Sequence, residues 1–344
     1  MLPLMTSVVK CIFCLVFLLS CSSRNTTLYS IYGTAQGTFY SVKYLSSKKV
    51  ISKSNIDSVL LDLDFSLSSY IDSSTISRVN NNSTNKVDFF LNTVLNRSLQ
   101  ICKETNGDFD ISIAPIVNHY GFGSKQKIIE IDTFNLSKYI GCDKIFIKNN
   151  LIQKEDKNIK IDVNGIAQGF SVDVLANFLK DQGIHNFIIN IGGEIFCSGK
   201  KKGKPWLVAI EQPFKNIQSQ KYILNLSNTA LATSGSYRKT KLLEGEIISH
   251  TMNPKTLRPV KNNLISVSIM SNNCMDADAY ATACMSMGLE RSKEFVKKKG
   301  IEACFMYIDK KDTLTYMTSG LLNLVSPDSP DFLDLQPSLG SAPQ

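Results

Sequence analysis

The order of strand-like and helix-like segments is the feature that most constrains the fold of this chain. Short runs of β-branched and aromatic residues at 187–190, 206–210, 265–269 and 303–308 predict strands. Longer patterns with apolar residues at helical spacing, such as 87–105, predict helices. The two kinds of segment do not alternate strictly, as they would in a parallel sheet built of strand–helix–strand units. The sequence therefore predicts an α+β fold in which helices flank a mostly antiparallel mixed sheet.

The chain is long enough for one large domain. It has 344 residues, of which 43% are hydrophobic, and it contains no internal repeat. Its net charge of +8 is spread over short lysine clusters such as 200–202 and 297–299, with few aromatic residues between them. Such clusters are typical of a solvated surface, so we expect no nucleic-acid partner. Beyond residue 20, no apolar stretch is long enough to span a bilayer.

The N-terminus has the pattern of an export signal. Lys10 precedes a short apolar stretch at 11–19, and Ser20 is a small residue before Cys21. The ending Leu-Leu-Ser-Cys resembles a bacterial lipobox, in which the cysteine becomes the lipidated first residue; the alternative is an ordinary cleaved signal with a chance cysteine. We expect a signal peptide at 1–20 and lipidation of Cys21. A polar tether at 21–28, a domain at 29–325 and a disordered tail at 326–344 would follow.

Six cysteines remain after the signal and Cys21. None of them forms a C-x-x-C pair, which argues against a zinc site or a thioredoxin-like motif. Most have apolar neighbours in the sequence and are expected to be buried thiols. An exported compartment permits disulfides, but the spacing does not decide whether any form.

Asp278 and Thr282 form the most distinctive local pair. They are four residues apart in a segment that is predicted to be helical, so the carboxylate and the hydroxyl share one face. Two hard oxygen ligands beside small residues suit a Mg²⁺ ion that also binds phosphate oxygens. Taken alone, such a pair is more often a solvated helix face or a cap.

Other segments contain residues suited to phosphate or nucleotide binding. The stretch 161–169 joins a strand to a helix through small residues, although Asp162 could be a plain N-cap. The stretch 233–238 combines hydroxyls, a glycine and Arg238, and fits either a phosphate site or a polar turn. His250 precedes a proline-restricted loop, where a lone histidine is more often structural. Acidic and aromatic residues at 107–115 suit a planar heterocycle or a core corner.

Seven of these segments together resemble the ApbE-type FAD:protein FMN transferase family, over roughly residues 30–320. In order they are Gly33-Thr-Ala-Gln-Gly-Thr38, Gly107-Asp-Phe-Asp110, Asp162-Val-Asn-Gly-Ile-Ala-Gln-Gly169, Asn190-Ile-Gly-Gly193, Thr233-Ser-Gly-Ser-Tyr237, His250-Thr-Met-Asn-Pro254 and Ala277-Asp-Ala-Tyr-Ala-Thr282. The resemblance implies a single ApbE-like domain. It also agrees with the N-terminus, because members of this family are often exported and lipid-anchored.

The resemblance also implies a reaction and a set of site residues. FAD would bind through Mg²⁺, and a threonine hydroxyl of a target protein would attack the phosphorus on the FMN side, releasing AMP. The metal ligands would be the side chains of Asp278 and Thr282 and the carbonyl of Gly165. Asp278 and His250 would be catalytic, with His250 accepting the threonine proton or orienting the phosphate. The residues expected around FAD are Gln36, Tyr70, Asp108, Phe109, Asp110, Asp162, Gln168, His250 and Thr251.

Four positions depart from the usual pattern of the family. Gln168 stands where lysine is usual, so a positive charge near the nucleotide is missing. Gln36 replaces a frequent methionine, Tyr120 a frequent tryptophan and Leu257 a frequent glycine. These changes affect the expected affinity for FAD more than the reaction class.

Two other functions fit the same residues. A Mg²⁺-dependent FAD pyrophosphatase would use water in place of threonine, and the sequence does not separate it from a transferase. An exported lipoprotein that only binds flavin is disfavoured, because binding alone needs neither a metal site nor His250. For a transferase the expected acceptor is an exported flavoprotein or a subunit of a membrane redox pump, on the periplasmic or extracellular side of a bacterial membrane.

Overall fold

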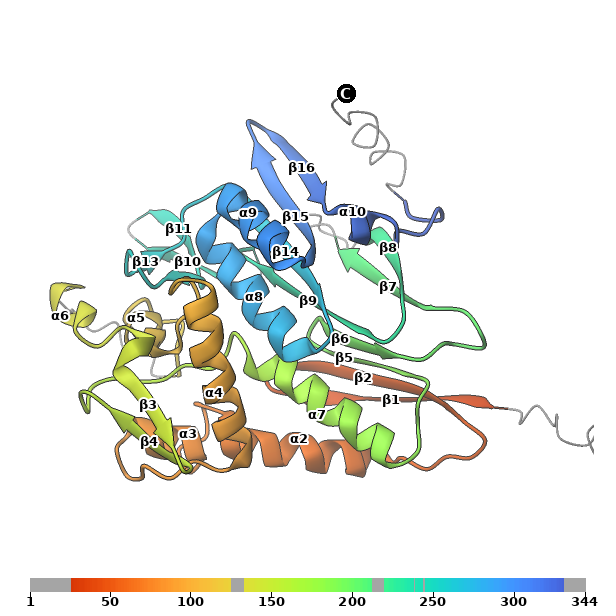
Figure 1. Cartoon of the computed structure of the whole chain (residues 1–344), viewed down its shortest axis with the longest axis horizontal. Helices are drawn as coiled ribbons and strands as arrows, with labels where there is room; N and C mark the ends of the chain where they lie inside the picture. The colour runs from red at the N-terminus through yellow and green to blue at the C-terminus, as the bar shows by residue number, and fades with distance from the viewer. Residues whose placement is uncertain (1–25, 125–132, 212–219, 238, 244, 331–344) are drawn as a thin grey trace, which may run out of the picture.

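An eight-stranded antiparallel sheet forms the centre of the molecule (Figure 1). The computed structural model describes residues 26–124, 133–211, 220–237, 239–243 and 245–330. Every neighbouring pair in the sheet is antiparallel. The strand order is β1 (Thr27–Ala35), β2 (Thr38–Ser46), β5 (Phe187–Ile191), β6 (Glu194–Ser198), β9 (Thr229–Gly235), β14 (Leu264–Ser271), β15 (Glu302–Asp309) and β16 (Asp312–Met317).

Helices cover one face of this sheet. α7 (Ala167–Asp181) and α8 (Cys274–Met287) lie directly on it, and α2 (Lys53–Leu67), α4 (Phe89–Glu104) and α9 (Leu289–Lys299) flank them (Figure 1). α7 buries a stripe at helical spacing, whereas α8 buries mostly small residues around its whole circumference. Small side chains let α8 approach both the sheet and α7 closely. The largest hydrophobic core lies between these layers.

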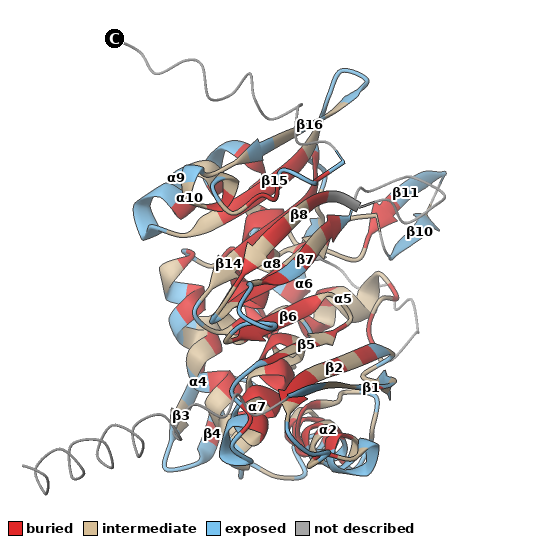
Figure 2. Cartoon of the chain, turned by 90° about the vertical axis from the view of Figure 1, so that its right-hand side faces the viewer, coloured by how far each residue is buried: buried red, intermediate tan, exposed pale blue. Residues whose placement is uncertain are grey.

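A second, smaller core covers part of the opposite face. The hairpin of β7 (Trp206–Glu211) and β8 (Gln220–Leu226) turns its alternate residues toward the sheet, and α10 (Ser319–Leu322) closes one side. Figure 2 shows buried residues concentrated along the sheet and the inner helix faces, with exposed residues on the outer loops. The site described below lies on the helical face, where the first turn of α7 meets α8.

The remaining elements are short. α3 (Thr75–Asn80), α5 (Ala114–His119), α6 (Thr133–Ser137) and two 3₁₀ turns, Ile111–Ile113 and Cys142–Lys144, surround the hairpin of β3 (Ile145–Lys148) and β4 (Leu151–Lys154). β10 (Thr240–Leu243) and β11 (Glu246–Ser249) form a hairpin before the two-residue strands β12 (Met252–Asn253) and β13 (Arg258–Pro259).

The predicted α+β class with an antiparallel sheet is confirmed. The predicted hairpin at 144–154 is also present, and its turn residues Asn149 and Asn150 have φ of 51° and 58°, as a tight hairpin turn requires. The stretch 233–238 is not simply a polar turn, since Thr233 to Gly235 end the central strand β9. The Thr233 and Ser234 hydroxyls contact hydroxyls of neighbouring elements inside the protein. Arg238 lies outside the described residues.

The ends of the domain differ slightly from the prediction. β1 begins at Thr27, inside the expected tether, because Thr27 and Leu28 already pair with β2. The domain also continues past 325, since Ser326 and Ser329 are buried and the Ser326 N–H donates to the Ile223 carbonyl at 2.7 Å. The signal peptide, Cys21 and residues 331–344 lie outside the described residues. No helix in the described ranges is long and apolar enough to cross a membrane.

Candidate active site

The structure brings the three predicted metal ligands together where α7 meets α8. Asp278 is buried, and its Oδ2 accepts the Gly169 N–H at 3.0 Å. Thr282, one helical turn further on, lies 3.3 Å from the Ser234 hydroxyl in β9. A Cβ added to Gly165 would be 3.0 Å from Thr282 Cγ2 and Oγ1, so the Gly165 backbone lies against that side chain. We refer to Gly165, Asp278 and Thr282 as the α7–α8 corner.

Local sequence explains why the two helices meet so closely. The Asn273 side chain caps α8 by accepting the Asp276 N–H. The carboxylate of Asp173, in α7, accepts the other two N–H groups of that first turn, those of Cys274 and Met275, both at 2.8 Å. Gly169 faces the start of α8, where an added Cβ would be 2.8 Å from Asp278 Cβ. Only glycine fits this contact, and it fixes the position of Asp278 relative to the first turn of α7.

The electrostatics of Asp278 fit a metal ligand. Burial raises the pKa of this carboxyl to about 7; the Gly169 N–H opposes the shift, and the nearby charge of Asp173 adds to it. In the described part of the chain no basic side chain forms an ion pair with Asp278. A buried carboxylate without a protein cation, beside a hydroxyl and a close backbone, is a donor set suited to a hard divalent cation such as Mg²⁺.

Asp162 lies at the edge of an open polar cavity of about 180 Å³. Its backbone N–H donates to the Ile111 carbonyl at 2.7 Å, and its Oδ1 accepts the Asn164 N–H at 2.7 Å. Burial raises the pKa of Asp162, whereas hydrogen bonds from Asn164 and the charge of Lys239 oppose that rise. The cavity is lined by Ser69, Asp72, Ser77, Asn80, Asn81, Ala114, Asn118, Gly123, Ser124, Lys160, Ile161 and Asp162.

Tyr70 adjoins this cavity through its chain neighbour Ser69. Its side chain is 62% exposed, and partial burial together with the charge of Asp162 raises the pKa of its phenol. An exposed aromatic ring beside a polar cavity could stack on a planar ligand. The structure therefore brings Tyr70 and Asp162 together, as the sequence predicted.

Gln168 lies in the first turn of α7, and Gln36 contacts the same helix at Ser171. Gln36 lies in the β1–β2 turn with φ of 52° and donates from Nε2 to the Ser171 hydroxyl at 2.7 Å. Gln168 donates from Nε2 to the Ile191 carbonyl at 3.3 Å. The Gln36 Oε1 atom is buried and has no hydrogen-bond partner among the described residues. A buried acceptor without a partner is costly, which makes this oxygen a candidate to accept an N–H.

His250 follows the β10–β11 hairpin. The Lys239 carbonyl accepts the His250 backbone N–H at 3.0 Å and lies 3.2 Å from the ring Nδ1. A carbonyl can only accept, so this contact favours the tautomer with the proton on Nδ1 and the lone pair on Nε2. The ring lies 6.3 Å from that of Phe122, centre to centre. Thr251, the next residue, is half-buried, and its carbonyl accepts the Val260 N–H at 2.9 Å.

The segment Asp108 to Asp110 supports the site from inside the protein. The Asp108 carboxylate is fully buried and pairs with Arg291 and, at 2.8 Å, with Lys255. Phe109 is buried in the core. Asp110 accepts hydrogen bonds from Ser112 and from the Cys142 N–H. Their place around the nucleotide, which the resemblance implies, stays a prediction; within the protein both carboxylates already have partners.

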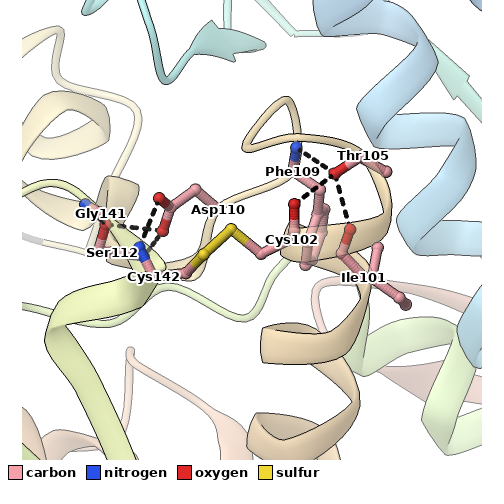
Figure 3. The surroundings of a disulfide bond; sticks show 8 residues. All are labelled: Ile101, Cys102, Thr105, Phe109, Asp110, Ser112, Gly141 and Cys142. Atoms are coloured by element: carbon pink, nitrogen blue, oxygen red, sulfur yellow. Dashed lines mark hydrogen bonds between the residues drawn. A yellow bond between two sulfur atoms is a disulfide. The ribbon is translucent and has the colours of Figure 1, made fainter.

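A disulfide lies beside this segment and links α4 to the 3₁₀ turn Cys142–Lys144. Cys102, at the end of α4, is bonded to Cys142, and the bridge lies beside Asp110 and Ser112 (Figure 3). The other four cysteines in the described ranges are buried and form no disulfide there, as expected. The pairing has a sequence separation of 40 residues, and no spacing rule in the sequence could have identified it.

Comparisons with known proteins extend these observations. Residues 36–305 match the model of the ApbE family. An FAD:protein FMN transferase of Vibrio cholerae serotype O1 is 33% identical, with 75% of this chain aligned to 81% of that protein. The Escherichia coli K12 protein of the same name is 28% identical, with coverages of 86% and 89%.

Solved structures give the same match in three dimensions. The flavin transferase ApbE from Vibrio cholerae superposes with a TM-score of 0.78 at 29% identity, covering 87% of this chain and all of that one. The apo form of the flavinyl transferase ApbE from Pseudomonas stutzeri superposes with the same TM-score at 26% identity, with coverages of 87% and 97%.

Proposed function

This chain belongs to the ApbE family, and from that premise we propose that it transfers the FMN part of FAD to a threonine hydroxyl of a target protein. The observation that carries the proposal is the convergence of Gly165, Asp278 and Thr282 at one corner. Asp162, which lines the cavity, lies three residues before Gly165 in the same segment. Members of the family with the name FAD:protein FMN transferase align over most of this chain. The site also offers polar groups suited to a flavin nucleotide.

The α7–α8 corner would hold Mg²⁺ through the Asp278 carboxylate, the Thr282 hydroxyl and the Gly165 carbonyl. When bound, Mg²⁺ would neutralise charge on the non-bridging oxygens of the FAD diphosphate. Asp278 must be ionised to act as a ligand, and the Gly169 N–H favours that form. Gly169 therefore supports both the position and the ionisation of the carboxylate.

The surrounding residues would orient the nucleotide. Gln36 Oε1 can accept an N–H from the flavin, because it is buried without a partner in the described structure. Tyr70 can stack on a ring at the mouth of the cavity. Lys239, whose charge reaches Asp162, offers a positive group to the nucleotide.

His250 would accept the proton of the acceptor hydroxyl at Nε2, since its Nδ1 faces the Lys239 carbonyl. The hydroxyl oxygen attacks the phosphorus on the FMN side, and the bond from that phosphorus to the bridging oxygen breaks. AMP leaves with the bridging oxygen, and the product is an FMN phosphoester on threonine. An imidazole oriented through Nδ1, with its lone pair on Nε2, suits this transfer.

A single incubation separates the candidate functions. The mature chain is mixed with FAD, Mg²⁺ and a protein domain that carries an acceptor threonine, and the products are read by in-gel flavin fluorescence and by AMP release. A fluorescent adduct together with AMP is the expected result. Free FMN and AMP without an adduct would support a pyrophosphatase, and FAD binding without turnover would support a flavin carrier.

We further propose that the enzyme is exported and lipid-anchored through Cys21, on the outer side of a bacterial membrane. Only residues 22–26 separate that cysteine from β1, a span of at most about 18 Å when extended. The catalytic domain would therefore stay close to the membrane and act on exported or membrane-bound acceptors. In a bacterial host, Cys21→Ala should abolish labelling by a palmitate analogue and move the protein out of the membrane fraction; unchanged labelling would refute the anchor.

A further inference from the structure

The β10–β11 hairpin presents an apolar pair to solvent. Leu242 and Ile247 are directly paired across the hairpin, and their side chains are 74% and 76% exposed. Lys241 and Ile248 form the neighbouring pair and point the other way, since Ile248 is buried. The hairpin projects from the body of the molecule in both views (Figures 1 and 2). One face of the hairpin therefore anchors it, while the other keeps two large aliphatic side chains in water.

This pair has a fixed relation to His250. The Lys241 ammonium donates to the Gly121 carbonyl and lies 5.2 Å from the centre of the Phe122 ring. At the base of the hairpin the Lys239 carbonyl accepts the His250 N–H. His250 directly follows β11, so the exposed pair and the proposed proton acceptor belong to one braced unit.

The surface around the hairpin is basic. Within 237–261 the described residues include five basic side chains and one acidic side chain, Glu246, which pairs with Lys261. Lys239 and Arg258 are exposed, and no ion pair involves either of them in the described structure. An apolar pair with a basic rim is complementary to a partner that carries apolar side chains flanked by acids.

We propose that Leu242, Ile247 and their basic rim are the docking surface for the acceptor protein. The inference rests on the proposed transferase function. It assigns to the acceptor an apolar side chain, flanked by acidic residues, close to the threonine that receives FMN. Hydrolysis needs only water at the site, whereas transfer requires the acceptor to cover the surface next to His250. Leu242 and Ile247 would therefore contact the acceptor protein and not FAD.

The test compares transfer with hydrolysis in the full mature enzyme. The acceptor probe is an exported redox-pump domain that carries a threonine in an acidic segment. Initial rates of fluorescent adduct formation are measured against acceptor concentration, and FMN release without acceptor is measured in parallel. The variants are Leu242→Ser/Ile247→Ser and Arg258→Glu. The matched control is Leu207→Ser, which changes a 64% exposed leucine on β7.

The double variant should raise KM for the acceptor about tenfold, with kcat, FAD affinity and acceptor-free hydrolysis unchanged. Arg258→Glu should raise the same KM and weaken its dependence on salt, and Leu207→Ser should change nothing. An unchanged KM in the double variant would overturn the inference while leaving the transferase intact. If the double variant instead lost self-association in sedimentation with KM unchanged, the surface would belong to contacts between copies. Absence of any adduct with the unmodified enzyme would overturn the proposed function and this inference with it.

Discussion

Replacing Gly169 by alanine should separate α7 from α8 and disable the α7–α8 corner. The added Cβ would lie 2.8 Å from both Asp278 Cβ and the Cys274 carbonyl carbon, and closer still to the carbonyl oxygen. Ordinary contacts of this kind exceed 3.4 Å, so the helices must move apart by more than half an ångström. None of these three atoms is the end of a flexible side chain, so a rotamer change cannot relieve the strain.

The expected effects are on both stability and activity. Overpacking of a tight core contact costs about 1–3 kcal/mol in the free energy of unfolding. A shift of Asp278 also weakens its hydrogen bond to the Gly169 N–H and changes its distance to Gly165. Because a misplacement of about 1 Å at a catalytic site can reduce the rate about 100-fold, we expect a loss of that order in kcat.

Urea unfolding and the initial rate of AMP release at several Mg²⁺ concentrations measure these effects. Gly183→Ala is the matched control, because Gly183 ends the same helix with φ of 75° and an added Cβ would meet no atom within 4 Å. It should cost about 1 kcal/mol through backbone strain and leave kcat unchanged. A Gly169→Ala enzyme with unimpaired stability and kcat would refute the packing argument.

Three other perturbations test separate parts of the account. Removing the disulfide with Cys102→Ser/Cys142→Ser should lower the free energy of unfolding by about 4 kcal/mol in the chain-entropy model, as measured in urea; a loss under 1 kcal/mol would contradict this. Burial alone would raise the pKa of Glu104, but hydrogen bonds from Tyr280 and two basic side chains outweigh it and lower the pKa to about 2. That stabilisation is present above pH about 4.5 and is lost as the pH falls through about 2. Because solvent screens these partly exposed groups, the unmodified enzyme should lose about 1–2 kcal/mol over this window, and Glu104→Gln should not. His250→Gln should reduce flavin transfer at neutral pH by about 10²–10⁴ with FAD affinity retained, as measured by adduct formation and fluorescence quenching; a loss under threefold would remove His250 as the proton acceptor.

Local sequence could place the candidate metal ligands close together because their spacing is local. Asp278 and Thr282 share a helix face by virtue of four-residue spacing, and Gly165 and Asp162 belong to the short segment that leads into α7. The strand expected before this segment is absent, since residues 159–166 form only coil and turns. The predicted helices and the hairpin at Asn149 and Asn150 likewise depend on neighbours in the sequence. Propensity and turn chemistry are sufficient for such features.

Contacts between distant segments were beyond the reach of the sequence. Asp108 pairs with Lys255 and Arg291, which lie 147 and 183 residues away, and no periodicity relates them. Tertiary packing likewise brings Cys102 to Cys142 and Gln36 to Ser171. The sequence therefore could not show that Asp108 and Asp110, which were predicted to lie near the nucleotide, also have partners within the protein.

The central claim is that one divalent cation is held by Asp278, Thr282 and Gly165. Its most direct test is a crystal of the enzyme grown with FAD and Mn²⁺ in place of Mg²⁺, with data collected to locate the metal by anomalous scattering. The account predicts one peak about 2.0–2.3 Å from the Asp278 carboxylate, the Thr282 hydroxyl and the Gly165 carbonyl, in contact with the diphosphate. Bound FAD with the metal elsewhere, or with no metal at this corner, would contradict it.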